Sequence, residues 1–311
     1  MSHNPFAADL SIRARIADLL PKFDAEVAAA IGQILRASPS LDSNLGGVVE
    51  KADVDRLVAA FSLTGVEDLM LLALPAAQEI AHPPISDFHV GSVGLEAETG
   101  NLVLGGNVEF PGTHLGYTVH GEGFVFTRAF SRGTSIKTIA IGEAHPCAHC
   151  RQYLSEFAAT RDLTLIDPLG HRLTMAQLYP WPFDPDYLGE TGAVPGKKLW
   201  TLTANDPPLR EAGERAHTPY SKCPAAVVLT LADGSRLRGS AIESVAFNPT
   251  MGPLQAVMID LLAHGRSYDE IVSATLGTVR GGAVDYAMSV DELLGKVAPQ
   301  AQLEVINWSP Q

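Results

Sequence analysis

Residues 120–150 read HGEGFVFTRAFSRGTSIKTIAIGEAHPCAHC, and their pattern predicts a helix, a buried strand and a second helix. The first helix offers three aromatic side chains to a core: Phe124, Phe126 and Phe130. The strand is the apolar run 136–142, and the second helix starts at Pro146. The first helix has two glycines in its first turn, although a glycine inside a helix lowers helix stability by about 1 kcal/mol relative to alanine. We interpret these glycines as a place where the backbone must approach a ligand closely.

The residues before this stretch change in character near position 80. Residues 12–31 have helical spacing that we expect to be interrupted at Pro21, and residues 54–63 have it again, with a loop predicted at 37–47. Residues 88–110 then alternate apolar and polar side chains on both sides of Thr99-Gly100, which is typical of a β-hairpin. Strands and helices in this order indicate an α/β layered sheet.

A second copy of this unit follows the first. AHPPIS (81–86) returns as AHTPYS (216–221). TGNLVLGGNVE (99–109) then returns as DGSRLRGSAIE (233–243), and within this second pair the offset is a constant 134 residues. Chance similarity between two hairpins is rejected, because the register and the preceding segment match together. We therefore predict an internal duplication. The predicted division is an N-terminal helical segment (1–48), a catalytic unit (49–187), and a linker with a degenerate unit (188–311).

The copies differ at the positions that carry chemistry. Carried forward with a one-residue gap, the repeat places His120 and Glu122 opposite Pro253 and Gln255, and the second copy has no cysteine pair. We therefore expect the site in the first copy alone.

Composition excludes several classes of partner. The 311 residues carry a formal net charge of −13 and no basic run, so a nucleic acid polymer is not an expected partner. The longest apolar run, 69–77, is short and contains Pro75, so we expect no membrane span, and no signal peptide is recognised. Three cysteines are too few for a disulfide framework, which favours a reducing, cytoplasmic setting.

His120, Cys147 and Cys150 are the candidate metal ligands. A C-x-x-C pair alone could be a redox pair, half of a structural zinc site, or chance. With His120 it makes three ligands and leaves one tetrahedral position open, which is typical of catalytic zinc. Glu122 would lie beside that position without being a ligand, an arrangement that favours hydrolysis by a metal-bound water. H-x-E followed by P-C-x-x-C is the signature of zinc-dependent base deaminases. His145 and His149 lie nearby, and neither is an expected ligand.

Several motifs together resemble the long-chain cytidine deaminases: PPISDFHVG, GGNVEF, TVHGE, PCAHCRQ, PYSK and AFNPT. The resemblance covers residues from Val66 to the C-terminus. It implies a three-layer α/β/α fold and a homodimer in which each chain has one live and one dead unit. It also implies one Zn²⁺ per chain and hydrolytic deamination of cytidine or deoxycytidine by zinc-bound hydroxide, with Glu122 as the proton shuttle.

The same resemblance implies roles for the residues around the metal. Asn107 and Glu109 would bind the sugar hydroxyl, and Phe88 would pack against the pyrimidine. The N–H of Gly121 would donate to the base O2, and the carbonyl of His145 would accept from the leaving amine. Two further segments would line the substrate: Phe183, and the loop of Val245, Ala246 and Phe247, which would enter the partner subunit's site.

Three positions depart from the family pattern, and two other functions stay open. The family usually has alanine at Gly121, commonly glutamine at Gly123, and a small or hydroxyl residue at His145. One alternative is therefore deamination of a modified cytosine nucleoside or nucleoside antibiotic. The other is a catalytically silent, zinc-stabilised domain that binds nucleosides or a partner protein. Against this second alternative stands Glu122, which a structural zinc site does not need. Deamination within RNA or DNA conflicts with the acidic charge.

Overall fold

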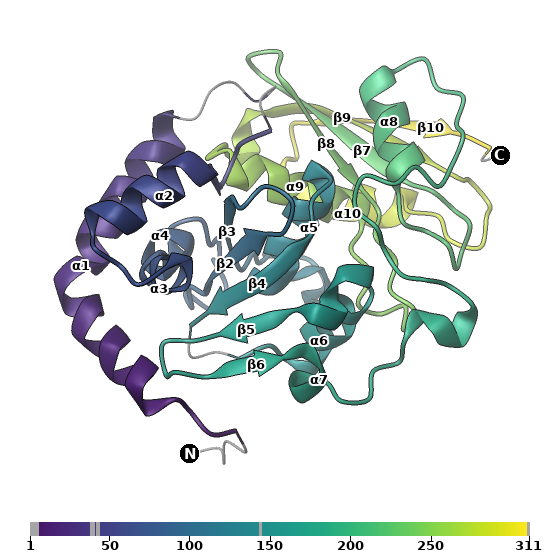
Figure 1. Ribbon diagram of the computed structural model, residues 1–311. Helices are drawn as coiled ribbons and strands as arrows, with labels where there is room; N and C mark the ends of the chain where they lie inside the picture. The colour runs from purple at the N-terminus through teal and green to yellow at the C-terminus, as the bar shows by residue number, and fades with distance from the viewer. Residues whose placement is uncertain (1–5, 38–40, 42–43, 143–144, 310–311) are drawn as a thin grey trace.

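A computed structural model describes residues 6–37, 41, 44–142 and 145–309. Its first sheet has the strand order β1-β3-β2-β4-β5-β6 (Figure 1). The strands are β1 (Val48–Val49), β2 (Gly91–Glu96), β3 (Leu102–Gly106), β4 (Ile136–Ile141), β5 (Thr164–Ile166) and β6 (Arg172–Thr174). β2 and β3 form the predicted antiparallel hairpin, and β4 runs parallel to β5.

Helices cover both faces of this sheet. One face carries α1 (Leu10–Ala37), α2 (Lys51–Ala60), α3 (Val66–Leu72) and α4 (Leu74–Gln78), with α1 outermost (Figure 1). The other face carries α5 (Gly121–Arg132) and α6 (Ala148–Ser155), and the short α7 (Met175–Leu178) follows β6. Short 3₁₀ turns lie at Leu115–Tyr117, Ala158–Asp162, Pro185–Leu188 and Tyr268–Glu270. The predicted three-layer α/β/α arrangement is confirmed.

Glycines in the hairpin set how closely the helices approach. The sequence alternates apolar and small residues, yet every residue of β2 and β3 is buried because both faces are covered. A Cβ on Gly105 would lie 2.2 Å from Cδ1 of Phe124 in α5, and one on Gly106 would lie 2.6 Å from Cα of Ala81. The missing side chains therefore place the start of α5 directly over the sheet.

The prediction that Pro21 interrupts the N-terminal helix is wrong. α1 runs unbroken through Pro21. A proline removes one backbone hydrogen bond, but Ile16, Val27 and Ile31 on both sides of it are fully buried against the first unit. This packing holds the helix together across the missing bond. The predicted loop at 37–47 lies partly outside the described residues.

The second unit repeats the first. Its elements are α8 (Pro207–Arg215), β7 (Ala226–Leu231), β8 (Arg236–Ser240), α9 (Pro253–Ala263), β9 (Ile271–Thr278), α10 (Ala287–Val297) and β10 (Gln302–Asn307). The strand order β10-β9-β7-β8 repeats β5-β4-β2-β3. An irregularity at Leu95/Glu96 in the first sheet also returns at Thr230/Leu231. The predicted duplication is confirmed.

The structure corrects one part of the sequence alignment. Val119 pairs with Val108 in the first unit as Met251 pairs with Ile242 in the second. The helix N-caps that follow are His120 and Gly252. Glu122 is therefore opposite Leu254, not Gln255. The sequence alignment allowed a gap of one residue, but the offset falls from 134 at Val108 and Ile242 to 132 at Val119 and Met251, because the loop before α9 is two residues shorter than the loop before α5.

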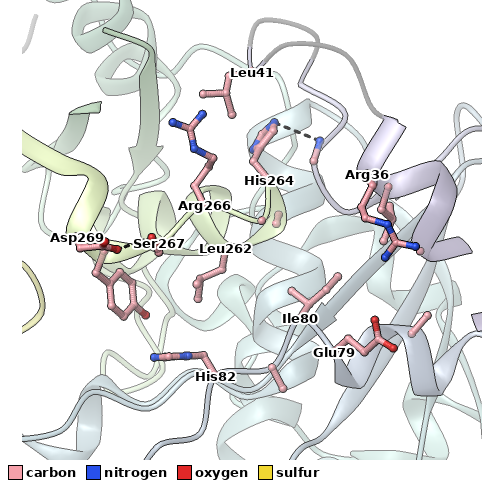
Figure 2. A pocket seen from close by; sticks show the side chains of 18 of the residues that line it. Arg36, Leu41, Glu79, Ile80, His82, Leu262, His264, Arg266, Ser267 and Asp269 are labelled. Atoms are coloured by element: carbon pink, nitrogen blue, oxygen red, sulfur yellow. Dashed lines mark hydrogen bonds between the residues drawn. The ribbon is translucent and has the colours of Figure 1, made fainter. Parts of the chain in front are cut away.

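The two units pack through α5 and α9, which share one hydrophobic core. Arg128 of α5 is fully buried, and its Nη1 lies 3.0 Å from Oδ1 of Asp260 in α9. A cavity of about 920 Å³ lies where the ends of α1, α4 and α9 meet, and there the N–H of Gly46 donates to His264 at 3.2 Å (Figure 2). None of the predicted site residues lines this cavity. Among the described residues, no helix has both the length and the apolar character needed to cross a membrane.

Candidate metal centre and active site

The three predicted ligands converge at the starts of two helices. His120 is the N-cap of α5 and Cys147 is the N-cap of α6, with β4 between the two helices. Nδ1 of His120 lies 3.5 Å from Sγ of Cys147 and 3.3 Å from Sγ of Cys150. Donors bound at about 2.0–2.3 Å in a tetrahedron lie roughly 3.5 Å apart, so this spacing fits a tetrahedral ion. The residues present fit zinc.

The cysteines are electrostatically prepared to bind a cation. Hydrogen bonds from Cys150 and from His120 lower the pKa of Cys147 to about 3. The pKa of Cys150 is raised, first by the hydrogen bond it gives to Cys147 and then by burial. Cys147 is therefore the more acidic thiol of the pair, and the thiolate is the form that ligates metals. The hydrogen bond to Cys147 also raises the pKa of His120.

Glu122 lies in the first turn of α5, beside the ligands. Its side chain is only 4% exposed, and Oε2 is 3.7 Å from Sγ of Cys150. Burial raises the pKa of its carboxyl group. Glu122 is not one of the three converging ligands. A buried carboxyl group outside the ligand set can accept and return a proton.

A second cluster lies in the loops that follow β4 and β5 and is held by hydrogen bonds. Nε2 of His145 and Nδ1 of His171 each lie 2.6 Å from Oδ2 of Asp167, which is fully buried. These separations are shorter than those between tetrahedral metal ligands and match hydrogen bonds. The His145 ring is thus turned toward Asp167. His149 is exposed and belongs to neither cluster.

Asn107 and Glu109 hold the segment that carries Phe88. The Asn107 amide donates to the carbonyl of Phe88 at 2.8 Å and accepts from the N–H of Val90 at 2.9 Å. Glu109 accepts from the N–H groups of Ile85 and Ser86 and from the Ser86 hydroxyl. Burial alone would raise the pKa of Glu109, but these hydrogen bonds lower it. Phe88 itself is 62% exposed.

Ser92 is a site residue that the sequence did not reveal. A Cβ on Gly121 would lie 2.5 Å from Oγ of Ser92, so Ser92 occupies the space of an alanine methyl group. Ser92 is fully buried, and Oγ has no hydrogen-bond partner among the described residues. The glycine at 121 therefore compensates for the serine. The glycine at 121, where the family usually has alanine, was the signal in the sequence. Only the fold shows that Ser92 fills the space of the missing methyl group.

Gly123 opens a small cavity next to the ligands. The cavity has a volume of about 180 Å³ and is lined by His120, Gly123 and Cys150 together with residues 249–251 of the second unit. A Cβ on Gly123 would meet Met251 only at 3.6 Å, an ordinary contact. The second unit thus closes the side of the metal centre that faces it.

The remaining predicted residues lie on exposed segments. Phe183 is 41% exposed, and its carbonyl accepts a hydrogen bond from Gln152 of α6 at 2.7 Å. Ala246 is half-buried, and Phe247 is 64% exposed with its ring 6.3 Å from that of Tyr220. Their contacts with substrate stay predictions.

The chain is similar to proteins of known family. Two family models, both described as the cytidine and deoxycytidylate deaminase zinc-binding region, match residues 64–165 and 204–289. A cytidine deaminase of Shewanella pealeana is 33% identical over 88% of this chain and 93% of its own length. One of Shewanella halifaxensis is 34% identical over the same shares.

The chain belongs to the cytidine deaminase family. The family's zinc-binding region and the His/Cys/Cys donor set identify the metal as Zn²⁺. The second match falls on the unit that has no residues aligned with His120, Cys147 and Cys150, so the two units share the family's fold. A solved cytidine deaminase of Mycobacterium leprae, 29% identical, aligns with 37% of this chain and 98% of its own, with a TM-score of 0.33.

Proposed function

We propose that this chain hydrolyses cytidine, deoxycytidine or both to the corresponding uridine and ammonia. The observation that carries the proposal is the convergence of His120, Cys147 and Cys150 beside a buried Glu122 that is not a ligand. A structural zinc site needs no such carboxyl group. The hydrolysis of a free nucleoside also agrees with a net charge of −13.

Zinc, when bound, supplies a Lewis acid that makes water nucleophilic near neutral pH. Glu122 accepts a proton from the attacking water and delivers it to N3 of the base as the C4–O bond forms. It then moves the second proton to the amine, and the C4–N bond breaks to release ammonia. Burial suits Glu122 to this work, because it raises the pKa of the carboxyl group and so favours the protonated form that delivers a proton.

Other residues of the first unit orient the base and the sugar. The N–H of Gly121 donates to O2, and the carbonyl of His145 accepts from the leaving amine. Asn107 and Glu109 bind the sugar hydroxyl. Their internal hydrogen bonds support this role, because they fix both side chains and the Phe88 segment before substrate arrives.

The proposal includes a homodimer in which each site is completed by the loop 245–247 of the other chain. Exposed aromatic side chains support it: Phe88 and Phe247 are 62% and 64% exposed. Large exposed apolar side chains near a site favour burial by a partner. A cytoplasmic location and the division at residues 48 and 187 also remain part of the proposal.

An ammonia-release assay tests this function. Cytidine, deoxycytidine and 5-substituted analogues are compared, each with and without a strong zinc chelator. The proposal expects chelator-sensitive turnover that is fastest on an unmodified nucleoside. Fast turnover of a 5-substituted analogue alone would instead indicate the modified-nucleoside function. Zinc-loaded protein that binds nucleosides without releasing ammonia would indicate a silent binding protein.

A further inference from the structure

Glu156 connects the helix of the metal centre to the second unit. It is the C-cap of α6, whose first residues include the cysteine ligands, and its side chain is fully buried. Oε1 accepts from Nε2 of His217 and from the hydroxyl of Tyr220, both at 2.7 Å. Oε2 accepts from the N–H of Val245, also at 2.7 Å. All three donors belong to the second unit.

The bond to Val245 bears on the exposed loop that follows. Val245 is buried, whereas Phe247, two residues later, is 64% exposed. Phe247 has a backbone φ of +63°, in the left-handed region that a phenylalanine rarely adopts. Such a conformation persists only when its surroundings fix it. The hydrogen bond from Val245 to Glu156 fixes the start of this turn from within the first unit.

The first unit shows that this arrangement is not a general feature of the fold. His82 takes the place of His217, because each pairs with the corresponding strand residue, Val108 or Ile242. Ile85 takes the place of Tyr220, since its N–H donates to Glu109 as that of Tyr220 donates to Glu243. Ile85 has no hydroxyl group and is 52% exposed. The tyrosine that meets Glu156 is therefore peculiar to the second unit.

We propose that Glu156 is a positioning residue that holds the loop 245–247 in the conformation offered to the partner subunit's site. This inference rests on the proposed shared site. It predicts that loss of Glu156 from one chain impairs the active site of the other chain. A merely structural role would impair the chain that carries the change, because α6 holds that chain's own metal ligands.

Mixed dimers separate these two roles. Donor chains carry Glu122→Gln, so they are inactive but keep an intact loop. Acceptor chains carry Phe247→Ala, so they keep an intact metal centre but offer a damaged loop. With donor chains in excess, acceptor sites receive donor loops, and turnover reports on those sites. Glu156→Gln is then added either to the donor or to the acceptor, and kcat and KM for cytidine are measured.

On the donor, Glu156→Gln is expected to raise KM about tenfold, which corresponds to losing a hydrogen bond to a charged group. On the acceptor, it is expected to leave KM within about twofold, a change too small to represent such a bond. Tyr220→Phe removes one donor from the same carboxylate and is expected to show a smaller effect with the same asymmetry. Glu79→Gln, which changes an exposed glutamate of the first unit, serves as the control on the donor.

The outcomes distinguish the two proposals. If subunit exchange is proven and the parent mixture recovers no activity, the shared site is wrong and the role of Glu156 fails with it. If the parent mixture recovers activity but Glu156→Gln acts equally on both chains, or only on the acceptor, the shared site stands and the positioning role is overturned. If Glu156→Gln does not fold, the asymmetry of Tyr220→Phe decides.

Discussion

Nδ1 of His120 lies 3.3 Å from Sγ of Cys150, although the two residues belong to different helices. Strand β4 lies between these helices in the chain and ends beside both helix starts. The metal centre is thus built by one helix-strand-helix segment. Its geometry depends on how closely α5 lies on the sheet, and Gly105 of the hairpin allows this approach, since a Cβ there would lie 2.2 Å from Cδ1 of Phe124.

Glu122→Gln is expected to retain the fold and the zinc but to lose about 100-fold or more in kcat, because glutamine cannot shuttle a proton. Ammonia release and metal analysis of the same preparation check this. Glu79→Gln, a change at an exposed glutamate outside the site, is the control. Wild-type turnover at full zinc content would show that Glu122 is not the shuttle.

Cys147→Ala is expected to lose zinc, because two protein ligands remain where a catalytic site uses three. The matched control is Cys223→Ala, a buried cysteine of the second unit, which is expected to keep one zinc per chain. Elemental analysis after dialysis measures both. One zinc retained by Cys147→Ala would contradict the ligand assignment, and zinc lost from Cys223→Ala would place a second site in the degenerate unit.

Ser92 and Gly121 are expected to be coupled. Gly121→Ala alone forces a methyl group to 2.5 Å from Oγ of Ser92 and is expected to cost about 1–3 kcal/mol of unfolding free energy. Ser92→Ala alone removes an unpartnered buried hydroxyl and is expected to be near neutral. The double variant is expected to recover most of the loss. Urea denaturation of the four proteins tests this, and additive effects would contradict the coupling.

Glu96 is expected to make stability depend on pH. Burial alone would raise the pKa of Glu96, but hydrogen bonds from Arg132, Thr134 and Thr99 lower it below its ordinary value of 4.5. A carboxyl whose folded pKa is depressed contributes stability above its unfolded pKa, and this is lost as pH falls through the folded value.

Glu96→Gln is therefore expected to cost about 3–5 kcal/mol at pH 7, because it leaves the Arg132 guanidinium unpaired. The difference from the wild type is expected to shrink as pH falls below about 4.5, the pKa of an unperturbed glutamate. Melting temperatures across this range measure it. A difference that is constant with pH would contradict the argument.

Much of the first unit and its metal site could be predicted from the sequence, because the motifs that define them lie within short segments. The hairpin alternation, the predicted helix starts near His120 and Pro146, and the ligand spacing all arise within short segments. The errors have long-range causes. α1 crosses Pro21 because distant packing outweighs one lost hydrogen bond, and Gly252 aligns with His120 because strand pairing fixes the register. Ser92 and Glu156 meet their partners only after folding, so no local pattern marks them.

The entrance of α9 shows what the second unit has at the place where the first unit has its histidine ligand. Its N-cap is Gly252, whose N–H donates to Gln255 at 3.0 Å, and the same glutamine donates to the carbonyl of Tyr117 in the first unit at 2.8 Å. The helix N-terminus that carries a metal ligand in the first unit carries a hydrogen-bonded brace between the two units in the second. A histidine at position 252 would bring a Cβ to 2.8 Å from Oε1 of Gln255, so we expect it to disturb this brace. We therefore expect a single return to the histidine of the first unit to cost stability, and one ligand alone does not complete a three-ligand site.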